Sequence, residues 1–564
     1  MKSERSQPPS ALRLASILAI GVTTLAVALL ALRLRYGFDA IDESYYAAGS
    51  YRFALGLRPI LDDLGPHQFA SYLTSPLVWA WLSLRGNLDG IILALRVTYF
   101  VASLIAATVA FTLLRKLLDW RIALVSVTCA LGLVPLLIFA PSYNTIAILS
   151  ISLGCSLAGI SLIDRDRPQL FLLSGMALTL AAIAYPTLAV VVVVAIPLLG
   201  WQSRSWKASA LMAAGVVLAA MVFLVTIRGT LVGASDFAMY NRFLSDQVGW
   251  LTGLKKLAIL ARGIVGETYL APAAWLMAVI VGYRLARRRV PIALTVLLPI
   301  STLLVFHVGG PAGRTMVTST FLLMSVAVSG MTCISAEQRK ALYFVFGVGT
   351  CAAAIIAYTS AGGFFSFGYG ATAVAAPALA VLLGNAQQAL AKRTSRTRGT
   401  LWAVVIGVLM ACGVVALCWE TVYPWGPAPL QLHANGAGPY AGLLGTAELA
   451  SASSQMRSDL ERAAAGPRDR LLVYGATPSA YILSPARPVA PFLWMGGVEG
   501  TSRPHAEFVV QWIETATHRP TLVLVDAGLW NGRASEPHDY LLDYIGRDFT
   551  PVLSRPGYVI LRAR

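Results

Sequence analysis

Long runs of apolar residues, separated by short polar segments, make up most of the chain before residue 421. A helix needs about 20 such residues to cross a bilayer, and lipid offers no partner for a free backbone group, so each run is expected to be helical. We count about thirteen runs of this length. They lie near residues 14–34, 92–114, 122–140, 144–163, 169–186, 187–203, 208–227, 268–283, 290–307, 314–334, 341–359, 371–391 and 400–420.

The two runs on either side of Pro186 form either a tight helical hairpin or one kinked helix. With two helices and a cytoplasmic N-terminus, most basic residues between the spans fall on the cytoplasmic side, as the positive-inside rule expects. A single kinked helix would instead place the basic cluster of residues 284–289 outside. The charge pattern therefore predicts an N-terminus inside and a C-terminus outside.

Three polar regions are then expected to face outward: a first outer loop at 35–91, a loop near 228–267 and a tail at 422–564. The tail alternates strand-like and helical patterns. Its expected strands are Arg470–Gly475, Thr521–Asp526 and Tyr558–Arg562, and its expected helices lie near 446–465, 505–518 and 537–547. The predicted fold is thus an all-α polytopic membrane domain at 1–421 with a C-terminal extracytoplasmic α/β domain.

Composition supports the membrane assignment. Apolar residues make up 57% of the chain and charged residues 13%, whereas soluble domains contain about 25% charged residues. The mean hydropathy is +0.68. The net charge of +17 follows from the positive-inside pattern and needs no nucleic acid to explain it. The six cysteines lie within apolar runs without metal-ligand spacing, which indicates small core residues.

The predicted spans carry almost no charge. Arg96, His307 and Glu420 lie at the ends of their runs, and the middle of each run is apolar. A transporter or flippase that moves a polar cargo usually needs ionisable groups near the middle of the bilayer. This distribution counts against transport as the main function.

Polar chemistry gathers instead in the first outer loop. Two of its stretches, Ser44–Leu55 with Ser44 as the cap and Phe69–Leu84 with several aromatic residues, are predicted to be helices lying in the membrane interface. Carboxylates held there would meet a substrate that has a polar head and a lipid tail.

The order of residues in this loop resembles a known family. Asp42-Glu43 follows the first run, Pro76-Leu77 comes next, and Arg96 opens the second run. This pattern resembles the GT-C superfamily of glycosyltransferases that use polyprenyl-phosphate sugars, nearest to the protein O-mannosyltransferases and the lipid A aminoarabinose transferases. The resemblance implies a GT-C membrane domain with a catalytic carboxylate in the first outer loop and a polyprenyl-phosphate-linked sugar as donor.

The chain departs from that family pattern at several positions. Ser75 stands where the first proline of a Pro-Pro-Leu element is expected, and Thr74 replaces a basic residue that some members carry before it. Tyr45-Tyr46 follows the acidic pair in place of Arg-Tyr. Lipid A is therefore not adopted as the acceptor, which is left open as a glycan, a lipid or a protein.

Within the resemblance, Asp42 is the candidate general base. Glu43 is the alternative catalytic or metal-binding residue, or only a favourable charge at a helix N-terminus. Asp63 is assigned to positioning of the acceptor or a metal, although a turn residue is an equal reading of Asp62-Asp63-Leu64-Gly65. Tyr45, Tyr46 and His67 are further candidates for contact with the acceptor.

The donor phosphate requires basic residues on the outer side, because guanidinium groups match phosphate oxygens. The candidates are Arg58, Arg96, Arg242, Lys255 and Lys256. Arg96 is equally well explained as a side chain that extends from a helix end toward water, and the basic loop near 228–267 as a solvated face. No cofactor is assigned. A divalent metal ion is an alternative, for which His67 and His307 would be the first ligands to examine.

The sequence thus predicts an inverting glycosyltransferase at the outer face of a bacterial cytoplasmic (inner) membrane, moving a sugar from a polyprenyl phosphate to an acceptor hydroxyl. Two alternatives are a transporter or flippase, and a polymerase or ligase of lipid-linked glycans. Polymerases and ligases usually centre on Arg and His residues in a large late outer loop, whereas here the acids follow the first span.

Overall fold

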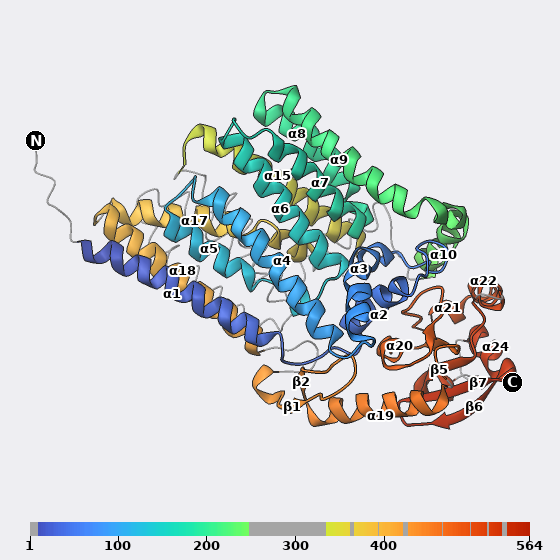
Figure 1. The fold of residues 1–564 in the computed structure, drawn as a ribbon. Coiled ribbons are helices and arrows are strands. Elements are labelled where there is room, and N and C mark those ends of the chain that lie inside the picture. Colours follow the sequence, from blue (N-terminus) through green and yellow to red (C-terminus); the bar gives the residue numbers. More distant parts are fainter. Residues whose placement is uncertain are drawn as a thin grey trace, which may run out of the picture.

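The structure, a computed structural model, describes residues 9–247, 334–360, 366–392, 394–420, 427–464, 466–496, 498–515, 518–532 and 538–564. These residues form a bundle of long helices, and a smaller domain of helices and strands packs against one end of it (Figure 1). Helices α2 (Asp42–Ala54) and α3 (Gln68–Arg85) lie between the bundle and the smaller domain.

The long helices of the bundle follow the apolar runs. They are α1 (Pro9–Arg33), α4 (Ile91–Leu114), α5 (Trp120–Leu131), α6 (Tyr143–Ile163), α7 (Gln169–Ala184), α8 (Ala189–Ser203), α9 (Trp206–Ile227), α15 (Ala336–Thr359), α17 (Ala375–Ala391) and α18 (Arg396–Glu420). Shorter elements are η1 (Pro135–Leu137), η2 (Pro186–Leu188), η3 (Arg228–Gly233), α10 (Ala234–Gln247) and α16 (Phe367–Thr372). Among the described residues, seven helical segments are long and apolar enough to cross a membrane. The protein is thus a polytopic membrane protein.

Every predicted run that falls within the described residues contains a helix, although not every run is helical over its full length. The runs near 268–283, 290–307 and 314–334 lie outside them, so the count of thirteen spans stays a prediction. The run predicted at 122–140 is helical only to Leu131, because Pro135 lacks the N–H that a continuing helix needs and opens η1 instead. At Pro186 the chain forms two helices, α7 and α8, joined by η2.

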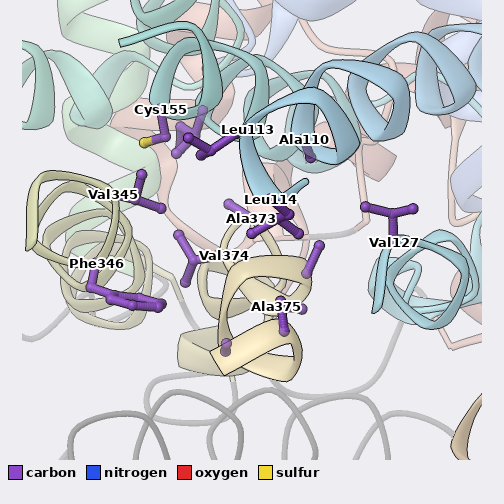
Figure 2. Packing of buried hydrophobic residues seen from close by; sticks show 14 of the residues in the cluster. Ala110, Leu113, Leu114, Val127, Cys155, Val345, Phe346, Ala373, Val374 and Ala375 are labelled. Carbon is purple, nitrogen blue, oxygen red and sulfur yellow. The ribbon is translucent and has the colours of Figure 1, made fainter. Parts of the chain in front are cut away.

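The bundle core consists of small and branched apolar side chains. Figure 2 shows one part of it, where Ala110, Leu113 and Leu114 of α4 lie in one cluster with Ala373, Val374 and Ala375, which lead into α17. Glycines allow the closest helix approach: a Cβ at Gly175 of α7 would meet the carbonyl oxygen of Met212 at 2.1 Å. Small residues at helix contacts are typical of membrane bundles, in which tight packing replaces the hydrophobic effect.

The smaller domain contains a five-stranded mixed sheet in the order β4-β3-β5-β7-β6. Strands β4 (Arg487–Pro488), β3 (Arg470–Tyr474) and β5 (Leu522–Asp526) are parallel, whereas β7 (Tyr558–Ala563) and β6 (Phe549–Ser554) continue the sheet antiparallel. Its helices are α19 (Ala447–Ala463), α20 (Ser479–Leu483), α21 (Val498–Thr501), α22 (Arg503–Glu514), α23 (Ala527–Asn531) and α24 (Tyr540–Asp548). The predicted α/β tail is confirmed, but β4 and β6 were not predicted. A short pair, β1 (His433–Ala434) and β2 (Leu444–Gly445), precedes α19, and η5 (Ala428–Leu430) lies before β1.

Backbone contacts join the smaller domain to the first outer loop and the bundle. The N–H of Gly90, just before α4, donates to the carbonyl of Gly438 at 3.0 Å, and the N–H of Leu64 donates to Pro491 O at 2.6 Å. Helix α2 packs against α20 and β4. The two ends of α2 therefore lie in different surroundings, one near the start of α4 and the other near the sheet.

Candidate active site at the start of helix α2

Helix α2 begins at Asp42, and the carboxylate of Asp39 caps its first turn. The Asp39 oxygens accept the N–H groups of Ile41 at 2.8 Å, Asp42 at 3.0 Å and Glu43 at 3.2 Å. The prediction that Ser44 caps this helix was wrong, because Ser44 lies within the first turn. Its hydroxyl donates to Asp39 O at 2.7 Å and bonds the hydroxyl of Tyr440 at 2.5 Å.

Glu43 is held in a buried ion pair with Arg96. The Nε of Arg96 donates to Glu43 Oε1 at 2.6 Å and Nη2 donates to Oε2 at 2.7 Å, while Nη1 bonds the carbonyls of Leu34 and Tyr36. Glu43 is 2% exposed and Arg96 5% exposed. All three guanidinium nitrogens are thus already engaged, which argues against the predicted phosphate-binding role of Arg96. The same geometry favours a structural role for Glu43, namely tying α2 to α4.

Asp42 differs from both neighbouring acids because its side chain is only half-buried. Burial raises the pKa of Asp39 to about 7, and repulsion from the negative charge of Asp42 adds to this effect. Burial, with smaller contributions from Tyr143 and Asp42, also raises the pKa of Tyr46. The Asp42 charge thus acts on Asp39 and Tyr46, and its side chain is less buried than those of Asp39 and Glu43.

An aromatic cluster from four segments includes Tyr46, which follows Asp42 by four residues and so lies on the same face of α2. The ring of His67 stacks on Tyr143 with centroids 3.8 Å apart and planes at 8°. Tyr143 also contacts Tyr46 at 6.0 Å and Tyr185 at 5.2 Å. Tyr143 is placed by a capping box, in which Ser142 and Thr145 bond each other's backbone N–H at the start of α6. The cluster joins the first outer loop to the ends of α6 and α7.

His67 is neutral at ordinary pH in this environment. Burial lowers the pKa of His67 to about 4. Its Nδ1 atom is buried and has no hydrogen-bond partner among the residues that the structure describes. The imidazole of His67 is thus neutral and stacked on Tyr143, and its contact with the acceptor stays a prediction.

The far end of α2 carries a second buried ion pair. Arg52, which is fully buried, donates through Nη1 to Asp63 Oδ2 at 3.2 Å, and through Nη2 to the carbonyls of Asp62 and Ala490. Asp63 also accepts the N–H of Gly65 at 2.8 Å. The turn interpretation of Asp63 therefore fits its geometry better than acceptor or metal binding.

The paired tyrosines after the acidic pair face different surroundings. The ring centroid of Tyr45 lies 5.9 Å from that of Phe492 and 5.7 Å from that of Trp494, so Tyr45 packs against the smaller domain. Tyr46 contacts Tyr143 and belongs to the aromatic cluster. Both tyrosines are buried, and the contact of either one with the acceptor stays a prediction.

Arg58 lies with the far end of α2 and away from Arg96. It follows the helix, and its backbone N–H and Nε donate to Asp62 Oδ2 at 2.7 and 3.3 Å. Since α2 has 13 residues and rises about 1.5 Å per residue, the two ends of the helix are roughly 20 Å apart. Arg58 and Arg96 are therefore too far apart to contact the same phosphate, and the role of Arg58 in donor binding stays a prediction.

The remaining predicted basic residues belong to the second outer loop. Arg242 is exposed on α10, whose Asn241 donates to the carbonyl of Leu64 at 2.9 Å. Lys255, Lys256 and His307 lie outside the described residues. Within the described part of the chain, no group of three His, Cys, Asp or Glu side chains is placed to hold a metal ion, so no step is derived through a metal.

Sequence reasoning did not select Asp39, Arg52, Tyr143 or Tyr185 for this site. The signal for Tyr143 was available, because Ser142, Asn144 and Thr145 form a polar step directly before an apolar run. The signal for Asp39 was its place three residues before Asp42, the spacing of a side chain that caps a helix. No local signal marks Arg52, whose partners come from separate segments.

Comparisons with known proteins give structural neighbours only. No family model and no curated protein matches the sequence. The fold is similar to a crystal structure of the Archaeoglobus fulgidus oligosaccharyltransferase in complex with zinc and sulfate, with a TM-score of 0.48 and 14% identity over 96% of this chain and 73% of that one.

Two crystal structures of ArnT from Cupriavidus metallidurans are also similar. The apo structure aligns with a TM-score of 0.43 and 15% identity over 96% of this chain and 97% of ArnT. The structure bound to undecaprenyl phosphate aligns with a TM-score of 0.45 and 14% identity over 97% of each chain. At this degree of likeness, the function has to be argued from the residues of this chain.

Proposed function

We propose that this protein is an integral membrane glycosyltransferase that moves a sugar from a polyprenyl-phosphate donor to an acceptor hydroxyl, with Asp42 as the general base. One observation carries the proposal. Of the three acids at the start of α2, Asp39 caps the helix and Glu43 is paired with Arg96, whereas Asp42 is half-buried beside the aromatic cluster.

The chemistry needs one base. As the acceptor oxygen bonds the anomeric carbon, Asp42 takes the hydroxyl proton, and the bond from that carbon to the phosphate oxygen breaks with its electron pair leaving on the lipid phosphate. Attack from the side opposite the phosphate inverts the anomeric configuration. The two carboxylates of a hydrolase are not required, because the leaving group is already an acidic phosphate.

The proposal assigns the other contacts by chemistry. Tyr46, Tyr143 and the neutral His67 offer ring faces and hydrogen-bonding groups to a sugar near Asp42. The donor phosphate is assigned to the basic residues of the second outer loop, Arg242, Lys255 and Lys256, because Arg96 is already engaged. The lipid tail of the donor would lie along the apolar helices of the bundle.

The proposal places this reaction at the outer face of the cytoplasmic membrane, with the N-terminus inside. A reporter enzyme that is active only outside the membrane, fused after Arg564, should then be active. A silent reporter on a stably produced fusion would place the smaller domain in the cytoplasm. The reaction would then occur at the inner face.

The activity itself is tested by donor consumption. Purified protein in lipid nanodiscs is supplied in turn with several polyprenyl-phosphate sugars and candidate acceptors, and release of polyprenyl phosphate is measured. We expect one donor to be consumed by the wild type and spared by the Asp42→Asn variant. The matched control is Asp89→Asn, the same change in the same loop at a partly exposed acid near Arg457. Equal consumption by all three proteins would reject Asp42 as the base.

A further inference from the structure

A cavity lies at the far end of α2, between the first outer loop and the smaller domain. It has a volume of about 720 Å³, within the range of small-molecule sites. One side is formed by the chain that follows α2, and the other by the segments around the starts of β3 and β4 and by His518. It is remote from Asp42, because α2 separates them by roughly 20 Å.

The lining of this cavity is strongly basic. It contains four arginines and one carboxylate. The arginines are Arg58, Arg468, Arg470 and Arg487, the carboxylate is Asp62, and His518 lies beside it. Because they come from separate segments of the chain, the fold has brought these charges together at one concave surface, which concentrates positive potential there.

Asp62 offsets only one of these positive charges, because its carboxylate pairs with Arg58. Oδ2 accepts from the N–H and Nε of Arg58, and Oδ1 lies 3.1 Å from Nε2 of His518. Although burial acts to raise the pKa of Asp62, the bonds from His518 and Arg58 hold it below its usual value. The carboxylate therefore stays charged and serves to fix Arg58 and His518 at the rim.

Two of the arginines have no acidic partner in the part of the chain that the structure describes. Arg468 and Arg487 are exposed and form no ion pair among the described residues. The nearby acid Asp469 is buried and lies 3.7 Å from Arg562 instead. Solvated surface arginines are common, but here they face a cavity that already holds Arg58. A planar guanidinium is the group that best matches phosphate and carboxylate oxygens.

The cavity also has an apolar wall, formed by Leu55, Leu57, Pro467, Pro488 and Val489. Gly56 makes the turn that brings this wall and Arg58 together: its φ of +89° ends α2, and the N–H of Leu57 returns to the carbonyl of Arg52 at 3.2 Å. A ligand with an anionic group and the less polar face of a ring would satisfy both surfaces.

We propose that this cavity binds an anionic saccharide, through a phosphate or carboxylate held by Arg468, Arg487 and Arg58. Resting on the proposed glycosyltransferase function, the inference is that this saccharide belongs to the acceptor. The acceptor would be an extended anionic glycan, anchored here while a hydroxyl several sugar units away reaches Asp42. The site binds and positions, and takes no part in bond making.

The binding is tested without any transfer reaction. The full-length protein in nanodiscs is titrated by calorimetry with glucose 6-phosphate, glucuronate, inorganic phosphate and glucose. We expect the two anionic sugars to bind, inorganic phosphate to bind more weakly and glucose not to bind. The Arg468→Gln/Arg487→Gln variant should weaken the anionic sugars about tenfold or more, since charge-assisted bonds are lost. Arg487→Lys, which keeps the charge but loses the planar fork, should give a smaller loss.

Arg503→Gln is the control, because Arg503 is an exposed arginine of the smaller domain that pairs with Glu507 and does not line the cavity. Equal affinity in the wild type and the double variant, with unchanged melting temperatures, would overturn the proposal. Inorganic phosphate binding as tightly as glucose 6-phosphate would overturn the saccharide assignment.

The outcome is separate from that of the proposed function. Anionic sugars can bind at these arginines even if no polyprenyl-phosphate sugar is consumed, which would reject the transferase and keep the site. If transfer occurs, the double variant should raise the acceptor KM about tenfold and leave kcat nearly unchanged. Transfer with an unaltered acceptor KM would separate the cavity from the acceptor.

Discussion

The two ends of helix α2 share a buried ion pair but differ in the sign of the less buried charges beside that pair. Each end has a buried ion pair, Glu43 with Arg96 at the start and Arg52 with Asp63 at the other end. Beside the first pair the half-buried group is an acid, Asp42. Beside the second pair the exposed groups are arginines around a cavity of about 720 Å³.

This comparison separates structural charges from those available to a ligand. A buried ion pair costs much to break and holds its partners in one arrangement. Groups that such pairs leave half-exposed can change partners when a ligand arrives. Along one helix, a half-buried acid thus lies at one end and a cavity lined by arginines at the other.

The first prediction concerns Asp42, at the acidic end of α2, and has the largest expected effect. Asp42→Asn keeps the shape of the side chain and removes its basicity. Loss of a general base lowers a rate by roughly 100- to 10,000-fold, whereas loss of a helix-end charge costs less than about 1 kcal/mol of stability. We expect a folded protein that binds donor and transfers almost no sugar, measured by single-turnover kinetics and by donor titration. Near wild-type transfer would return Asp42 to the role of a helix-end charge.

The second prediction concerns the buried ion pair of Glu43 and Arg96, which lies beside Asp42 in the chain. Glu43→Gln leaves Arg96 buried without a counter-charge, which costs about 3–5 kcal/mol, so the variant should unfold at markedly lower denaturant concentration. The Glu43→Gln/Arg96→Met variant removes both charges and should cost less than the sum of the single changes. Denaturant titration in detergent measures both. If Arg96→Met instead keeps its stability and weakens donor binding about tenfold, the predicted phosphate role of Arg96 is restored.

The third prediction concerns how the stability of the protein depends on pH through His67. The folded-state pKa of His67 is about 4, below the ordinary value of 6.5, so the fold disfavours its protonated form. Its contribution to stability is therefore complete above pH 6.5 and is lost as the pH falls toward 4, at up to about 1.4 kcal/mol per pH unit. His67→Phe keeps a ring against Tyr143 and cannot titrate.

Melting temperatures of the two proteins between pH 4 and pH 7 test this prediction. The wild type should lose more stability than His67→Phe on acidification. Parallel curves for the two proteins would mean that His67 is protonated freely in the folded state, and that its ring is more accessible to water than the stacking on Tyr143 implies.

Much of the fold follows from local sequence, because a membrane span is encoded by about 20 consecutive apolar residues. The errors occurred where the local signal was short or shared. Residues 132–140 are apolar, yet Pro135 ends the helical pattern there. Strand β4 has two residues, and β6 is an edge strand with Pro551 and a bulge, so neither shows clear alternation.

The site was less predictable, because its roles depend on pairing over long distances. The Asp42-Glu43 pair was visible, but which acid is half-exposed depends on Arg96, 53 residues from Glu43 in the chain. The same holds for Arg52, which bonds Ala490 in the smaller domain. Residue type marks which groups can ionise, while tertiary contacts decide which of them are engaged.

The last prediction concerns two charged residues of the smaller domain that belong to neither end of α2. Asp526 caps α23 by accepting the N–H of Gly528, and His538 pairs with Asp543 at an exposed position. Exposed groups of this kind usually change stability by less than about 0.5 kcal/mol. Asp526→Asn and His538→Gln should therefore leave turnover within about twofold of wild type, measured on the same donor and acceptor as Asp42→Asn. If either variant loses transfer while it still binds donor and melts normally, part of the chemistry lies in the smaller domain. In that case the base has to be sought around β5 and α24 as well as at the start of α2.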